Sequence, residues 1–243
     1  MNVADVSRAP PEYQDVAWVA DACKLLMGVG WTTNYVGMIY KSLQDQTYGM
    51  ALMPLCCNFA WELTYALIYP FGSGLEMWVH YSGLILNCGV MYTAIKNAPR
   101  EWAHAPLVQR NLPLIFIICV AGWTSAHLAL AKQIGPTLGQ ALSAYGCQLL
   151  LSVGGLCQLM SRGHSRGASY SLWFSRFFGS LVLVPQDILR YRYWRENHEF
   201  MGSPLYIWFV CIFLVLDGSY GICLWYVRRF ERERAAANKC KKM

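Results

Sequence analysis

Long apolar stretches alternate with short polar connections along the chain. Each stretch is about twenty residues long, enough for a helix to cross a hydrocarbon layer of about 30 Å. Because backbone groups inside a bilayer must bond within their own segment, we expect every stretch to be an α-helix. A closed barrel is excluded, since no period-two alternation is sustained. The pattern predicts an all-α bundle of seven transmembrane spans, at 18–40, 48–69, 75–95, 112–131, 136–160, 169–189 and 204–227.

These spans and their connections occupy almost the whole chain, so we expect one membrane domain over residues 1–243 and no soluble domain. Residues 1–17 are polar and lack a basic region leading to a cleavage site, which argues against a removable signal peptide. The composition agrees, because 56% of residues are hydrophobic and 14% are charged, whereas soluble proteins average about 25% charged. We therefore expect the lipid bilayer to surround the protein and no nucleic acid to bind it.

The net charge of +6 is concentrated after the last span. Because cytosolic segments are rich in Lys and Arg, the basic tail 228–243 predicts a cytosolic C-terminus and, with seven spans, a lumenal N-terminus. The connection RYRYWRENHEF at 190–200 does not fit this charge bias. The ending KCKKM is similar to the dilysine signal that retrieves membrane proteins to the endoplasmic reticulum, which we expect to be the location. The alternative interpretation is a tail attracted to anionic lipid.

Cysteine and histidine give little indication of a metal. Nine of the ten cysteines fall within predicted spans, where cysteine behaves as a small buried hydrophobic residue, and no CxxC pair occurs. Glu76 and His80 are one helical turn apart, and His127 lies toward the end of its span. Histidines near an interface usually cap or hydrogen-bond locally. We therefore expect no metal site.

Ionisable residues inside a span are energetically costly and so indicate function. Asp21 and Lys24 are three residues apart and are expected to pair, while Arg176 is expected to extend toward the membrane surface and Asp187 to lie at the interface. Glu62 and Asp217 differ, because neither has a basic residue within one helical turn. Burial without a charged partner favours the neutral acid, which can protonate a substrate oxygen or alkene. The alternative is a neutral acid that bonds only to a neighbouring helix.

Both acids lie on aromatic helix faces. Helical spacing aligns Asn58, Glu62, Tyr65 and Tyr69 on one face, and Tyr206, Phe209, Phe213, Asp217 and Tyr220 on another. Aromatic faces attract cations, so each acid is suited to a reaction that generates a carbocation. From their positions along the spans, the two acids differ in depth by roughly 7 Å, which argues against a shared proton. Pro54 is expected to loosen the second helix before Glu62.

Several classes are excluded by missing motifs. The chain has no DDxxD, NDxxD or DxDD cluster, so neither Mg²⁺-dependent ionisation of a prenyl diphosphate nor DxDD-type chemistry is expected. The seventh span contains no lysine for a retinal Schiff base. No internal repeat of the transporter kind is evident.

Six segments resemble the fungal integral-membrane terpene cyclases of indole-diterpene and meroterpenoid pathways. They are APPEY at 9–13, NYVGMIY at 34–40, YGMALMPLCCNFAWELTYALIYP at 48–70, CQLLLSVGGLCQL at 147–159, RGASYSLWFSRFFGS at 166–180 and LDGSYGICLWYV at 216–227. The resemblance implies a seven-span fold in the endoplasmic reticulum membrane. It also implies acid-initiated cyclisation of an epoxidised prenyl chain, without a metal or other cofactor, in secondary-metabolite biosynthesis.

The same resemblance implies that Glu62 and Asp217 are the catalytic acids. We expect the substrate pocket around them to include Asn58, Trp61, Tyr65, Tyr69, Phe213 and Tyr220. The chain is most similar to the paspaline and paxilline branch, which implies an epoxidised geranylgeranyl-indole substrate supplied by a prenyltransferase and an FAD epoxidase. An epoxyfarnesyl polyketide is the alternative substrate. A small-molecule transporter or receptor that uses the same buried acids is the non-enzymatic alternative.

Overall fold

The computed structural model describes residues 9–70 and 74–241, and every regular element within these ranges is a helix. The side chains of residues 75 and 76 are not described. The elements are α1 (Pro11–Asp45), α2 (Leu52–Leu63), the π-helix η2 (Thr64–Ile68), α3 (Leu75–Glu101), α4 (Pro106–Ile134), α5 (Pro136–Arg162), α6 (Tyr170–Leu181), α7 (Leu183–Tyr193), α8 (Arg195–His198), the 3₁₀-helix η3 (Glu199–Gly202) and α9 (Pro204–Cys240). The prediction of an all-α protein is confirmed.

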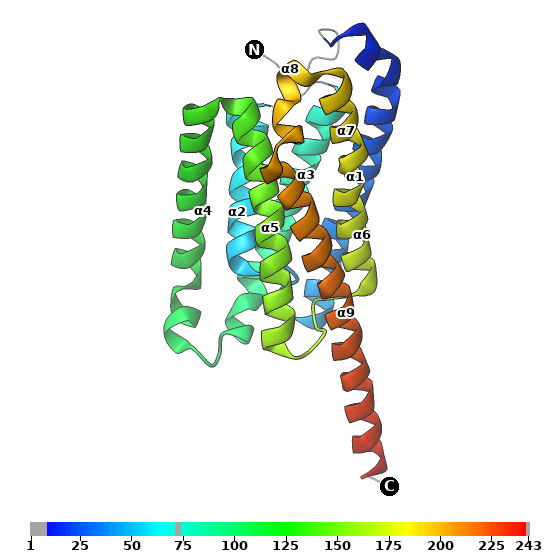
Figure 1. The fold of residues 1–243 in the computed structure, drawn as a ribbon. Coiled ribbons are helices and arrows are strands. Elements are labelled where there is room, and N and C mark those ends of the chain that lie inside the picture. The colour runs from blue at the N-terminus through cyan, green and yellow to red at the C-terminus, as the bar shows by residue number, and fades with distance from the viewer. Residues whose placement is uncertain (1–8, 71–73, 242–243) are drawn as a thin grey trace.

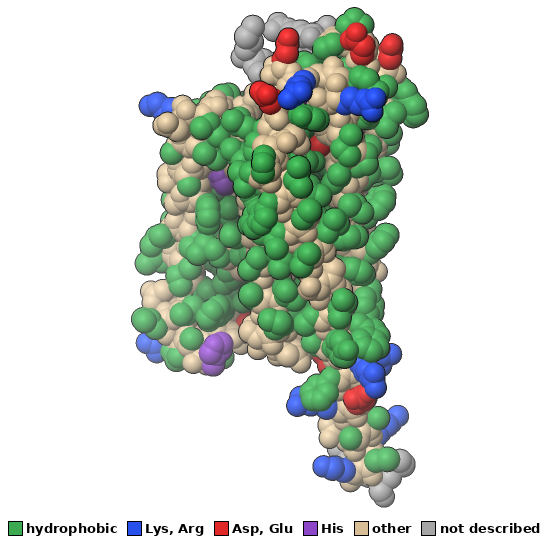
Figure 2. All heavy atoms as spheres, in the orientation of Figure 1, with side chains coloured by type: hydrophobic (Ala, Val, Ile, Leu, Met, Phe, Trp, Pro, Cys, Tyr) green, Lys and Arg blue, Asp and Glu red, His purple; other side chains and the backbone are tan. Residues whose placement is uncertain are grey.

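Each predicted apolar window coincides with a helix or a pair of consecutive helices. Three of them, α4, α5 and α9, are long and apolar enough to cross a membrane, and Leu52–Ile68 is a shorter apolar helix. On the face shown in Figure 2, hydrophobic side chains cover the middle of the bundle, while charged side chains gather at its two ends and on the protruding part of α9. This distribution is typical of a protein whose middle part is surrounded by lipid. The number of spans remains a prediction.

The helices form an elongated bundle (Figure 1). Helix α1 packs against α3, α6 and α7, whereas α2 contacts α3, α4 and α5, and α9 contacts α5 and α6. Helix α1 begins at one end of the bundle and α9 extends beyond the other (Figure 1). The extension carries the basic tail, most of whose described residues are exposed.

Helices α1 and α6 approach closely because glycine faces glycine. A Cβ atom added to Gly30 would lie 2.7 Å from the Cα of Gly179, so no larger side chain fits between the two backbones. One turn along α1, Asn34 Nδ2 donates a 2.6 Å hydrogen bond to the carbonyl oxygen of Leu172 on α6. Small residues and cross-helix hydrogen bonds hold helices together in lipid, where the hydrophobic effect between helices is weak.

Polar contacts join three connections at one end of the bundle. Glu101, which ends α3, lies 3.9 Å from Arg162 Nε and 3.5 Å from Arg166 Nη2 in the α5–α6 region. Arg166 Nη2 also donates to the backbone oxygen of Asp45, and the Gly167 amide donates to the Asp45 carboxylate. The first, third and fifth connections therefore lie together. The main apolar core adjoins these connections. It includes Tyr48, whose ring centre lies 4.1 Å from the Arg162 guanidinium.

The second helix is irregular, but not at Pro54, where the sequence predicts that it loosens. Pro54 falls in the first turn of α2, where a missing amide removes no helical bond. The helix changes instead after Glu62, where Thr64–Ile68 winds as a π-helix and the Tyr69 amide bonds to the Thr64 oxygen five residues earlier. Such π-helical turns are frequent at functional sites.

The predicted span 169–189 is broken at Val182 into α6 and α7. Pro185 lies one turn further on and cannot donate to the carbonyl of Leu181, which accounts for the break. In the connection 190–200, which opposed the charge bias, residues 190–193 extend α7, and the following residues form α8 and η3 at the other end of the bundle. Its Trp194 is buried against Tyr13 at the start of α1, with ring centroids 5.3 Å apart.

Candidate active site

A cavity of about 270 Å³ lies within the bundle, on the other side of the main apolar core from the connections joined by Glu101. Helices α1, α2, α3, α5, α7 and α9 all contribute to its wall, together with the end of α6. Most of the wall is apolar or aromatic. Each of two carboxylic acids, Glu62 on α2 and Asp187 on α7, lies at a separate cluster of polar side chains in this wall.

Glu62 is buried at the cavity wall among three neutral hydrogen-bond donors. The Tyr35 hydroxyl on α1 donates to Oε1 across 2.7 Å, and Asn87 Nδ2 on α3 donates to Oε2 across 2.9 Å. Asn58, one turn earlier on α2, donates to the Tyr35 oxygen at 2.6 Å and more weakly to Oε1 at 3.5 Å. Three helices therefore fix the orientation of this carboxyl group. Sequence spacing identified Asn58 but could not identify Tyr35, which comes from another helix.

Aromatic rings surround this part of the cavity. Trp61 packs against His80 with centroids 5.7 Å apart, and Trp31 packs against Tyr35 at 5.6 Å. Phe213 of α9 closes the wall and stacks on Phe177. Such π-faces stabilise cations, so the wall suits a carbocation formed beside Glu62.

Three of the predicted pocket residues, Asn58, Trp61 and Phe213, line this cavity, and the other three lie elsewhere. Tyr65 is turned toward α4 and α5, where it contacts His127 and lies beside Gly139. Tyr69 follows the π-helix, whose wider turn rotates it off the face that carries Glu62. Tyr220 packs on the Arg176 guanidinium in a separate small pocket of about 30 Å³. In this structure these three residues therefore do not line the cavity that contains Glu62.

Asp217 is fully buried, and it has a basic partner that its own helix does not supply. Arg176 of α6 places Nη2 2.5 Å and Nε 3.1 Å from Oδ1, and Ser152 of α5 donates to Oδ2. Arg176 therefore turns inward to an ion pair and does not extend to the membrane surface. Charges 41 residues apart pair across two helices, which spacing along one helix cannot reveal. Asp217 is also absent from the residues that line the cavity.

A chain of hydrogen bonds connects Asp217 to the cavity. Ser152, which donates to Asp217, accepts a hydrogen bond of 3.1 Å from Gln148 Nε2. The Ser180 hydroxyl donates to Gln148 Oε1 at 2.9 Å, and both Gln148 and Ser180 line the cavity. Asp217 thus contacts the cavity only through other side chains, and its geometry is that of a positioning residue.

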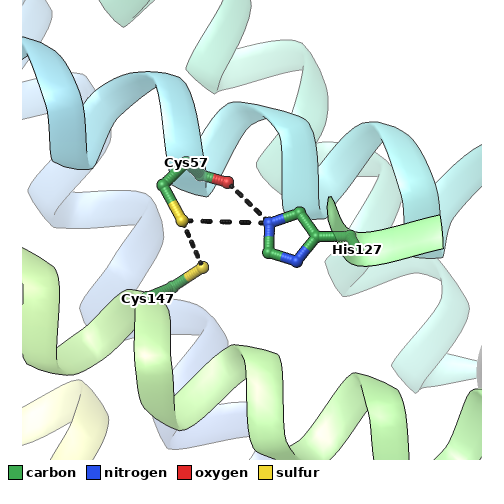
Figure 3. A group of neighbouring side chains, drawn as sticks. All are labelled: Cys57, His127 and Cys147. Atoms are coloured by element: carbon green, nitrogen blue, oxygen red, sulfur yellow. Dashed lines mark hydrogen bonds between the residues drawn. The ribbon is translucent and has the colours of Figure 1, made fainter. Parts of the chain in front are cut away.

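Cys57, His127 and Cys147 form a buried cluster between α2, α4 and α5 (Figure 3). Cys57 Sγ lies 3.4 Å from Cys147 Sγ and 3.8 Å from His127 Nε2. The potential ligand atoms all lie within 4.8 Å of one another, so two thiols and an imidazole could hold a thiophilic ion. Nothing in the sequence indicated this cluster, because its three members come from three different helices. The side chain of Glu76 lies outside the described part of the chain.

The remaining expectations for charged residues have mixed outcomes. Lys24 and Asp21 pair at 3.2 Å as predicted, with Lys24 at the cavity wall. Asp187, expected at the membrane interface, is buried at the cavity and accepts hydrogen bonds from Tyr145 and Tyr206. The break between α6 and α7 turns this residue inward.

Comparison with known proteins places this site in a family. Residues 4–230 match the Pyr4-like transmembrane terpene cyclases, and the chain belongs to this family. It is 83% identical over 242 residues to terpene cyclase dpfgB of Gibberella zeae, covering all of both chains. It is 57% identical over 231 residues to terpene cyclase penB of Penicillium crustosum and 58% identical over 231 residues to terpene cyclase ptmB of Penicillium ochrochloron, covering 95% of each chain in both comparisons. All three of these relatives are named terpene cyclases, which indicates that this family member is an enzyme of the same class.

Proposed function

We propose that the protein cyclises an epoxidised prenyl chain by protonating the epoxide, with Glu62 as the proton donor. The observation that carries this proposal is the position of Glu62, buried at the wall of an aromatic cavity with only neutral hydrogen-bond partners. A buried carboxyl group without a charged partner has the lowest free energy when it is neutral. A neutral acid at the wall of an aromatic cavity is the group this reaction needs.

The steps balance as an isomerisation. The Glu62 proton passes to the epoxide oxygen, the bond from that oxygen to the more substituted carbon breaks, and the neighbouring alkene supplies the electron pair for the new ring bond. Aromatic rings such as Trp61 and Phe213 stabilise the successive cations and exclude water. The last cation loses a proton to a water molecule or a basic group, and Glu62 regains a proton from solvent, so the product has the mass of the substrate. Asp217 acts through Ser152 by holding Gln148 at the cavity wall.

The proposed substrate is epoxidised geranylgeranyl-indole, which would give a paspaline-type product after an upstream prenyltransferase and FAD epoxidase. An epoxyfarnesyl polyketide is the alternative, because the same acid and aromatic wall would serve either chain. We also propose seven spans in the endoplasmic reticulum membrane with the N-terminus in the lumen. The three connections joined near Glu101 support an alternating path of the chain. The final two residues of KCKKM lie outside the described residues.

Product analysis tests this proposal. Membranes from yeast that express the protein are incubated with each epoxide in turn. The products are then separated by chromatography, and their masses are measured by mass spectrometry. Cyclisation is expected to give a new compound of unchanged mass from one of the two. Recovery of both epoxides unchanged, from membranes that contain the folded protein, would contradict the cyclase assignment and favour a transporter or receptor.

A further inference from the structure

A second polar site lies in the wall of the cavity that also contains Glu62. It consists of Asp187 on α7, Tyr145 on α5 and Tyr206 on α9, three helices that meet at the end of the bundle closed by α8 and η3. We propose that this site binds the aromatic head group of the substrate through an N–H or O–H of that group. The inference deepens the proposed function and rests on it, because it assigns the two ends of the prenylated substrate to two acids.

The hydrogen bonds of the site determine which ligand it accepts. Tyr145 donates to Asp187 Oδ2 across 2.6 Å, and Tyr206 donates to the same oxygen across 3.0 Å. Both hydroxyl protons are therefore directed at the carboxylate, and the tyrosine oxygens keep only lone pairs for a ligand. Arg190, three residues further along α7, adds a positive charge to the same wall, which favours the ionised carboxylate. A site of this kind accepts hydrogen bonds, so its ligand must donate one.

The rings of the site determine the shape of that ligand. Tyr145 stacks on Phe209 with centroids 5.8 Å apart and planes at 23°, and meets Tyr206 edge-on at 5.3 Å and 82°. Planar rings pack favourably in such stacked and edge-on arrangements. The ligand that matches both properties is a planar aromatic or heteroaromatic group with an N–H or O–H, such as an indole or a phenol.

The chemistry of the two acids fixes the direction of the substrate. Protonation of an epoxide requires a neutral acid, and Glu62 has only neutral partners. Asp187 differs from Glu62 because the basic Arg190 lies on the same helix and in the same wall, whereas the hydrogen-bond partners of Glu62 are all neutral. The epoxide end therefore lies at Glu62 and the head group at Asp187, with the prenyl chain folded between them along the aromatic wall.

Binding of ligands without an epoxide tests the site separately from catalysis. The full-length protein in detergent is titrated with geranylgeranyl-indole and its N-methyl derivative, and with a farnesylated phenol and its O-methyl derivative. The wild type is expected to bind the N–H or the O–H ligand about tenfold more tightly than its methylated partner, as one hydrogen bond to a charged group predicts. Asp187→Asn should reduce this preference to near unity. Asp15→Asn, on the exposed face of α1, is the matched control and should keep it.

Glu62→Gln separates this inference from the proposed function, since it should lose turnover and retain the preference for the N–H or O–H ligand. Tyr145→Phe and Tyr206→Phe, which each remove one hydroxyl and keep the ring, should each weaken the preference even if Asp187→Asn fails to fold. Equal binding of both members of both ligand pairs by the wild type would overturn the inference. So would an unchanged preference in all three variants of the site. A third outcome would also overturn the inference. If Asp187→Asn retained the preference for the N–H or O–H ligand but gave a product with a shifted double bond, Asp187 would instead be the base that removes the last proton.

Discussion

The Tyr35 hydroxyl of α1 donates a 2.7 Å hydrogen bond to Glu62 Oε1 of α2, and this contact aims the carboxyl group at the cavity. Asn58 donates to the same hydroxyl oxygen, so the pair belongs to a network that joins two helices. The orientation of Glu62, the proposed proton donor, therefore depends on a hydroxyl group from another helix.

Tyr35→Phe removes this donor and keeps the ring. We expect turnover of the epoxide to fall about tenfold, because one buried hydrogen bond of this kind contributes about 1–3 kcal/mol when a charged or ionisable partner loses it. Tyr40→Phe, an exposed tyrosine on the same helix, is the matched control and should be unaffected. Initial rates of product formation in microsomes check this. Unchanged turnover in Tyr35→Phe would show that the contact does not orient Glu62.

Asp217→Asn should chiefly destabilise the protein, because it leaves Arg176 buried without its partner. Breaking a buried ion pair from one side typically costs about 3–5 kcal/mol. The double variant Arg176→Gln/Asp217→Asn should recover part of this loss, since no charge is then left alone. Thermal unfolding of the wild type, the two single variants and the double variant in detergent measures this double-mutant cycle. If the two single variants are as stable as the wild type and their effects simply add, the ion pair is not a structural element.

Gly83 on α3 tests the space beside Glu62. A Cβ atom at Gly83 would lie 3.6 Å from Glu62 Oε1, an ordinary contact that the fold can accept. Gly83→Ala should therefore keep or slightly raise stability, by up to about 1 kcal/mol from helix propensity, while turnover falls because the methyl group occupies substrate space. Gly122→Ala on α4, where nothing lies within 4 Å, is the control and should leave turnover unchanged. Equal turnover in Gly83→Ala and Gly122→Ala would show that the substrate does not occupy the space beside Gly83.

The cluster of Cys57, His127 and Cys147 gives a prediction about metals. Cys57 Sγ contacts Cys147 Sγ, and His127 Nε2 lies 3.3 Å from the Cys57 carbonyl oxygen, so each member already has a partner within the protein. We expect cyclisation to survive dialysis against chelators of Zn²⁺ and of Cu⁺. Turnover measured before and after dialysis checks this, with Cys147→Ser in parallel. Loss of activity that Zn²⁺ or Cu⁺ restores in the wild type but not in Cys147→Ser would show that the cluster holds a functional metal.

Helical segments and buried acids could be predicted from the sequence because both depend on local patterns. Apolar length specifies a helix in lipid, and Glu62 is conspicuous within its apolar segment. Contacts between helices could not be predicted in this way. Arg176 reaches Asp217 from another helix, and Tyr35 and Asn87 reach Glu62 from two more.

Local irregularities also limited the prediction of the site. The π-helix after Glu62 rotates Tyr69 away from the face that a regular helix would give it. The break at Val182 turns Asp187 into the cavity although it lies near the end of its predicted span. The break has a local cause in Pro185, which the sequence shows, but its effect on Asp187 depends on how α7 packs in the bundle.

The central claim, that Glu62 supplies the proton, is tested most directly by the rate of cyclisation in Glu62→Gln. The amide keeps the size and hydrogen-bonding capacity of the side chain but has no acidic proton. With equal amounts of folded protein and Glu233→Gln in the exposed tail as control, we predict that turnover of the epoxide falls by about 10²–10⁴-fold in Glu62→Gln alone. Turnover within a few-fold of the wild type in Glu62→Gln would contradict the account.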